Sequence, residues 1–179
     1  AAALSEAGYQ TALIGKAHFA TTQTFTPQPT PECKSGSAEY PPSWTGPYMG
    51  FDYVELVTQG HWHKIRPPVL PPSGQHYENW FFNEVGGAEG FELWKSETQP
   101  NTGAAQTWAS ALPVAWHSSS WVGDRAIDWI SKQKEETPFC IWVSFPDPHH
   151  PFDCPEPWSM LHDPSDVELP EFLEKDLDR

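Results

Sequence analysis

The stretch that decides the fold runs from residue 138 to residue 158 and reads PFCIWVSFPDPHHPFDCPEPW. It begins with a continuous apolar segment, FCIWVSF, which is typical of a strand in the middle of a sheet that is covered on both faces. The segment ends in prolines and acids, where His149 and His150 lie between Pro148 and Pro151. These prolines restrict the backbone and so lower the entropy cost of aiming the imidazoles. We expect one histidine to act in a site and the other to support it.

Helices are predicted before this strand and before an earlier one. In residues 118–136, SSSWVGDRAIDWISKQKEE, apolar residues recur on one helical face, Ser119 or Ser120 is available as a cap, and Thr137-Pro138 ends the helix. That face is formed by Val122, Ala126, Trp129, Ile130 and Gln133. Residues 1–8, AAALSEAG, are helix formers, and YQTALIG follows as a strand. Two helix-to-strand units of the same sense favour an α/β fold with a mainly parallel sheet.

Basic side chains follow both predicted strands. Lys16 and His18 come directly after YQTALIG, and His149 and His150 come after FCIWVSF. The carboxyl ends of parallel strands lie along one edge of a sheet, where ligands bind in open α/β folds. We therefore expect Lys16, His18 and at least one of the paired histidines to share a crevice. A third strand is predicted at FDYVELV, residues 51–57, while residues 20–50 and 66–117 are read as mostly long loops.

Other candidate sites carry weaker signals. Lys16 does not belong to a nucleotide-binding P-loop, because the glycine spacing is wrong and no Ser or Thr follows the lysine. His61 and His63, in H-W-H, have a spacing that suits a metal, but no third ligand lies nearby. The three cysteines show no C-x-x-C spacing, so neither a disulfide framework nor a structural zinc site is indicated. Cys140, inside the apolar strand, is read as a core residue.

The charge balance narrows the range of partners. Ten Lys and Arg residues against 24 Asp and Glu residues give a formal charge of -14, which disfavours nucleic acid and anionic membranes. An anionic substrate would therefore need a local site of Lys, His or metal. No apolar run is long enough to span a bilayer. A cytoplasmic location is slightly favoured, although the chain begins at Ala1 rather than Met, so a signal peptide cannot be assessed. The sequence does not indicate an oligomeric state.

Two segments together resemble signatures of the type I sulfatase family, within the alkaline phosphatase superfamily. GYQTALIGKAHF matches G-Y-x-T-x-x-x-G-K-x-H, and PFCIWVSFPDPHHPF is similar to the family's strand ending in a P-H-x-P turn. The first pattern is filled by Gly8, Tyr9, Thr11, Gly15, Lys16 and His18. GPYMGFDYVEL and WVGDRAIDWI also read like family segments. The resemblance is nearest to the arylsulfatase, choline-sulfatase and phosphonate monoester hydrolase branch, and it implies an alkaline phosphatase-like α/β fold with a mainly parallel sheet flanked by helices.

The resemblance also implies a chemistry. In the family, a cysteine in C-x-P-x-R becomes formylglycine, whose hydrate attacks sulfur or phosphorus while a divalent cation, Ca²⁺ or alternatively Mn²⁺ or Mg²⁺, polarises the ester. By matching position, Lys16 would contact the sulfate, His18 would hydrogen-bond the formylglycine hydrate, and His149 would steady the ester oxygens or leaving group. His150 is expected beside it in substrate binding. The implied substrate is a small-molecule sulfate or phosphonate ester.

The sequence departs from the family in its nucleophile. None of Cys33, Cys140 and Cys154 lies in C-x-P-x-R, and the family's metal-binding aspartates have no match. We therefore expect residues 1–179 to be an internal part of a single, incomplete sulfatase-type domain. Formylglycine and the metal would come from other parts of the parent, and the isolated chain would be inactive. The resemblance leaves two alternatives: a phosphonate or phosphate mono- or diesterase of the same superfamily, and a catalytically silent carbohydrate-binding protein. The second is motivated by four tryptophans in predicted loops, Trp44, Trp62, Trp80 and Trp94.

Overall fold

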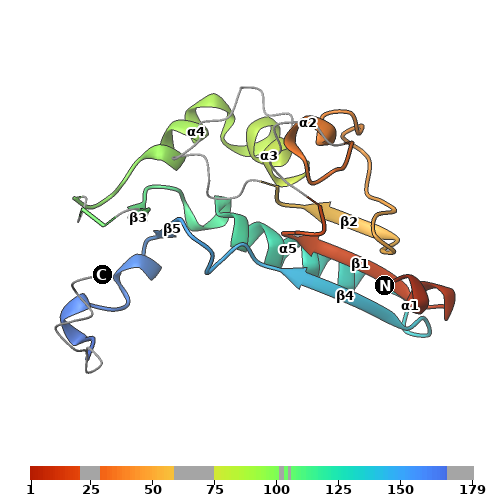
Figure 1. The fold of residues 1–179 in the computed structure, drawn as a ribbon. Helices are drawn as coiled ribbons and strands as arrows, with labels where there is room; N and C mark the ends of the chain where they lie inside the picture. The colour runs from red at the N-terminus through yellow and green to blue at the C-terminus, as the bar shows by residue number, and fades with distance from the viewer. Residues whose placement is uncertain (21–28, 59–74, 101–102, 105, 169–179) are drawn as a thin grey trace, which may run out of the picture.

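The larger of two sheets in the computed structural model, which describes residues 1–20, 29–58, 75–100, 103–104 and 106–168, is parallel and three-stranded (Figure 1). Its strands are β1 (Gln10–Gly15), β2 (Tyr53–Leu56) and β4 (Phe139–Ser144), in the order β2-β1-β4. All three predicted strands therefore form, and the α/β class with a mainly parallel sheet is confirmed.

β1 is the central strand and is buried from Thr11 to Gly15. Its register aligns Gly15 with Leu56 of β2 and with Ser144 of β4. A short helix, α1 (Ala2–Glu6), precedes β1, and Gly8 follows it with a φ of +88°, a conformation that suits glycine just after the end of a helix. The sheet thus presents the carboxyl ends of all three strands at one edge.

Helix α5 (Ser118–Ser131) packs on the sheet and ends earlier than predicted. On the predicted apolar face, Val122, Ala126 and Trp129 are buried, whereas Ile130 is 42% exposed. Arg125 on this helix donates to both carboxylate oxygens of buried Glu55 in β2, with Nε–Oε2 and Nη2–Oε1 distances of 2.7 and 2.6 Å. This fork binds the helix to the sheet.

The prediction that β4 is covered on both faces is wrong for the described residues. β4 lies at an edge of the described sheet, and its residues are exposed or half-buried, including Cys140. Trp142 is 47% exposed, although it contacts Phe19 edge-on at a ring-centroid distance of 5.4 Å. An apolar run identifies a strand but not what covers it.

The prediction of mostly loop over residues 66–117 is wrong where the structure describes them. This region contains α3 (Tyr77–Trp80), a π-helical turn η2 (Phe81–Val85), α4 (Gly87–Lys95), β3 (Thr107–Ser110) and the 3-10 turn η3 (Val114–Trp116). Its core is aromatic, with Tyr77, Phe81, Phe91 and Trp94 almost fully buried. Short helices that pack through large rings do not need the long apolar period that sequence patterns detect.

The tryptophans proposed as a sugar-binding platform are mostly packed. Trp94 is 1% exposed, Trp80 stacks on Tyr77, and Trp44 stacks on His76. The expectation of an exposed loop residue is therefore wrong for Trp94. Trp62, like His61 and His63, lies outside the described residues.

Most of the remaining described elements follow β4 in the sequence. β5 (Phe152–Pro155) pairs in parallel with β3, and the 3-10 turns η4 (Trp158–Met160) and η5 (Pro164–Asp166) follow it, while α2 (Lys34–Ser37) lies in the segment between β1 and β2. A search of the described residues finds no helix with the length and hydropathy of a membrane span.

Candidate functional site

At the carboxyl ends of β1 and β4, the backbones of the two strands lie very close together. Gly15 pairs with Ser144, and the Lys16 N–H donates to the Ser144 carbonyl oxygen at 2.8 Å. Gly15 has a φ of +115°, and a Cβ added to it would lie 1.9 Å from that same oxygen. Only glycine fits this position, which explains the glycine before the lysine in G-K-x-H.

Lys16 and His18 follow β1 at this edge. Lys16 is half-buried, and burial lowers the pKa of its ammonium from the ordinary value. His18 is exposed. A buried carboxylate that the sequence did not reveal, Glu32, accepts hydrogen bonds from the backbone N–H groups of Phe19 and Ala20 at 3.1 and 3.2 Å. The segment that carries Lys16 and His18 is therefore fixed at both ends.

His149 and His150 follow β4 on an exposed turn. Their rings stack at a centroid distance of 4.3 Å with an interplanar angle of 26°, and His149 Nδ1 contacts the His150 carbonyl oxygen. The His149 N–H donates to the Pro146 carbonyl oxygen at 3.1 Å. The structure thus brings together the strand ends that precede the two pairs of candidate residues, while the roles of Lys16, His18, His149 and His150 stay predictions.

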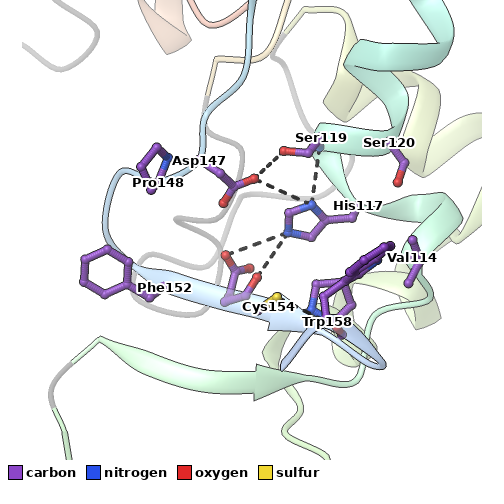
Figure 2. A pocket seen from close by; sticks show the side chains of 11 residues that line it. Val114, His117, Ser119, Ser120, Asp147, Pro148, Phe152, Cys154 and Trp158 are labelled. Carbon is purple, nitrogen blue, oxygen red and sulfur yellow. Dashed lines mark hydrogen bonds and ion pairs between the residues drawn. The ribbon is translucent and has the colours of Figure 1, made fainter. Parts of the chain in front are cut away.

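A pocket of about 440 Å³ lies between the start of α5 and β5 (Figure 2). Buried His117 lies in its wall, with Nδ1 4.0 Å from Asp147 Oδ2 and Nε2 4.0 Å from Oδ1 of the buried Asp153. His117, rather than Ser119 or Ser120, caps α5, because its Nδ1 accepts the Ser119 N–H at 3.3 Å. Sequence reasoning gave His117 little weight. The feature of the sequence that could have identified His117 is its position directly before a predicted helix.

His117, Asp147 and Asp153 are a candidate divalent-cation site. Each offers one ligand atom, and these atoms lie within 4.8 Å of one another. One imidazole and two carboxylates suit Zn²⁺ or Mn²⁺. However, Nδ1 already accepts from the start of α5, and Nε2 lies 3.2 Å from the Asp153 carbonyl oxygen. Coordination would therefore require His117 to give up a backbone hydrogen bond, and we assign no chemical step to a cation here.

The surroundings of Cys154 do not favour its thiolate form. Burial, followed by the charges of Asp147 and Asp153, raises the pKa of the Cys154 thiol. Cys33 is buried and Cys140 is half-buried in β4. A protonated thiol is a poor nucleophile, so this geometry does not favour a cysteine hydrolase.

Comparison with known proteins gives two matches. A family model described as Sulfatase matches residues 1–163. The "Uncharacterized sulfatase YidJ" of Escherichia coli (strain K12) is 25% identical over 178 residues, which cover 96% of this chain and 27% of that protein. The chain thus spans about a quarter of the length of the curated relative it matches. No solved structure matches.

Proposed function

Since the chain belongs to the sulfatase family, we propose that it forms one wall of an active site that hydrolyses a sulfuric ester. The observation that carries this proposal is the pairing of β1 with β4, which aligns Gly15 with Ser144 at the end of both strands. It supports a shared site for Lys16 and His18 after one strand and His149 after the other.

In the proposed site, Lys16 supplies the positive charge that binds the ester oxygens. The formal charge of the chain is -14, so a sulfate ester would be repelled by most of the surface. A half-buried ammonium binds an anion more strongly than an exposed one, because water screens it less. Fixed donors aimed at developing negative charge also lower the barrier to ester cleavage.

The two histidines would share protons with the reacting groups. Imidazole donates or accepts a proton near neutral pH, which suits His18 for hydrogen bonding to a nucleophile and His149 for steadying the ester oxygens or the leaving group. Lys16 and His18 lie on a short segment that is held in place by the hydrogen bonds from the N–H groups of the next residues to Glu32. His150, stacked on His149, would support it.

The nucleophile and the catalytic cation are proposed to come from outside these 179 residues, since the sequence contains no C-x-P-x-R. In the intact parent, formylglycine would supply the nucleophilic hydrate, and a divalent cation would polarise the ester. The isolated chain is accordingly proposed to be inactive. The residues of this chain would bind, orient and exchange protons with the ester.

Turnover of an aryl sulfate and an aryl phosphonate by the longer protein that carries this chain tests the proposal. We expect Lys16→Ala and His149→Ala each to lower kcat/KM for the sulfate by about 100-fold or more. His162→Ala is a matched control, because His162 is an exposed histidine that follows η4 and is not one of the residues proposed for the site. Faster turnover of the phosphonate would assign a phosphonate ester instead. Wild-type rates in Lys16→Ala would exclude the proposed role of the lysine.

A further inference from the structure

A single buried imidazole lies between the two ends of the histidine turn, which we define as residues 147–153. His117 is 6% exposed and faces this turn from the start of α5 (Figure 2). Nε2 lies 3.2 Å from the carbonyl oxygen of Asp153 at the end of the turn. Nδ1 lies 4.0 Å from the Asp147 carboxylate at its beginning. One side chain is therefore in reach of both flanks of His149 and His150.

Ser119 connects the imidazole to the beginning of the turn. Its N–H donates to His117 Nδ1 at 3.3 Å, and its hydroxyl donates to Asp147 Oδ2. Because Nδ1 accepts, these hydrogen bonds assign the ring proton to Nε2, which donates to the Asp153 carbonyl oxygen. Asp147, Ser119, His117 and Asp153 thus form one continuous hydrogen-bonded chain across the turn.

This chain of hydrogen bonds is attached to a rigid element. The Trp121 N–H donates to the His117 carbonyl oxygen at 3.1 Å in the first turn of α5. Trp121 and Val122, which follow, are buried in the main core. The start of α5 is therefore fixed. Its hydrogen bonds to the histidine turn restrain a turn whose own histidines are exposed.

We propose that His117 and Ser119 are positioning residues that hold the histidine turn, and with it His149, in the orientation needed to act on the ester in the transition state. The inference rests on the proposed function for the role of His149, while the anchoring itself rests only on the contacts above. Asp147 lies two residues before His149 and Asp153 four residues after it. Holding both flanks limits the movement of the ring between them, and small displacements of a reacting group cost large factors in rate.

Ser119→Ala and Ser120→Ala form a matched pair for the test in the longer protein. Both serines line the pocket in the first turn of α5, and only Ser119 bonds to His117 and Asp147 in the hydrogen bonds described. A His117 variant would also remove the cap of α5, so Ser119→Ala is the cleaner change. Hydrogen exchange, measured by mass spectrometry on a peptide covering residues 145–156, reports on the His149 N–H bound to Pro146.

We expect Ser119→Ala to increase exchange in this peptide by about tenfold, because it removes a hydrogen bond to a charged group. Exchange in β1 stays unchanged, which separates local release of the turn from general destabilisation. In Ser120→Ala both regions exchange as in the wild type. In turnover, kcat of Ser119→Ala falls about tenfold or more while KM changes little.

Three results would overturn the inference. Unchanged exchange in Ser119→Ala would show that the turn is held by other contacts. Faster exchange with unchanged kcat would show that the anchor does not serve catalysis. Faster exchange of the wild type after EDTA treatment, equal to that of Ser119→Ala, would show that a cation holds the turn instead. The proposed function fails separately, through unchanged turnover in His149→Ala, so the two failures are distinguishable.

Discussion

β1 and β4 pair along their full lengths and each precedes candidate site residues, yet their surroundings differ sharply. β1 is buried between two neighbours, whereas β4 is at an edge of the described sheet with half-exposed and exposed side chains. The carboxyl end of β1 is fixed by the close backbone contact at Gly15. The carboxyl end of β4 leads into an exposed turn, which a side chain of α5 contacts. The two parts of the proposed site are thus positioned by different means.

The difference teaches where each part of the site is sensitive. On the β1 side, any atom added at the strand end collides with the backbone of β4. On the β4 side, the turn is exposed, and His117 and Ser119 form hydrogen bonds to it. Substitutions in β1 should therefore destabilise the sheet strongly, and substitutions around the β4 turn should change activity more than stability.

The largest effect is expected for Gly15→Ala. The added methyl group would lie 1.9 Å from the Ser144 carbonyl oxygen at a φ of +115°, so the strands must separate. We expect a loss of about 3–5 kcal/mol in the free energy of unfolding, measured by urea denaturation. Gly123→Ala is the matched control: Gly123 is in α5 with no atom within 4 Å of an added Cβ, and the change should stabilise by about 0.5–1 kcal/mol. Equal effects in the two variants would contradict this account of the β1 exit.

A smaller contrast is expected between Leu13→Ala and Trp142→Ala, which are paired across β1 and β4. Leu13 is fully buried, so its truncation should cost about 3 kcal/mol. Trp142 is 47% exposed, and we expect its truncation to cost only about 1 kcal/mol despite its larger size. The same denaturation curves decide the comparison. A cost for Trp142 as large as that for Leu13 would indicate that β4 is covered by further parts of the protein.

The smallest effect is expected in the pH dependence of anion binding. Burial lowers the pKa of Lys16, so its ammonium loses its proton, and the site its charge, at a pH below the ordinary 10.5. Affinity for inorganic sulfate as a competitive inhibitor should fall about tenfold as pH rises through that range. Lys16→Arg should keep any residual affinity to higher pH, since a guanidinium stays charged. Constant sulfate affinity through pH 10.5 would contradict a binding role for Lys16.

Much of the sheet could be predicted from sequence because its strands are short apolar runs, two of which follow predicted helices. YQTALIG, FDYVELV and FCIWVSF all form strands, and the parallel pairing of the first and third follows from their order. The exposure of the β4 side chains could not be predicted, because it depends on which elements pack against the strand and not on the apolar sequence of the strand. The small helices α3 and α4 were missed because large aromatic side chains bury them without a sustained period.

For the site, strand order and motif spacing were enough to predict that Lys16, His18 and His149 follow strands that end at one edge. The residues that fix them were not predictable in the same way. Glu32 reaches its partners from a segment without periodicity, and His117 reaches Asp153 from 36 residues away. Such contacts depend on how chain segments meet in space, and neither composition nor local pattern encodes that meeting.

The central claim is that Lys16 and His149 act on the same ester, and a double-mutant cycle tests it most directly. The measured quantity is kcat/KM for an aryl sulfate in the longer protein, for Lys16→Ala, His149→Ala and the double variant. Groups that act as a unit are non-additive, so we predict that the double variant loses at least about fivefold less than the product of the single losses. If the loss of kcat/KM in the double variant equals the product of the two single losses to within about twofold, the shared site at the carboxyl ends of β1 and β4 is contradicted.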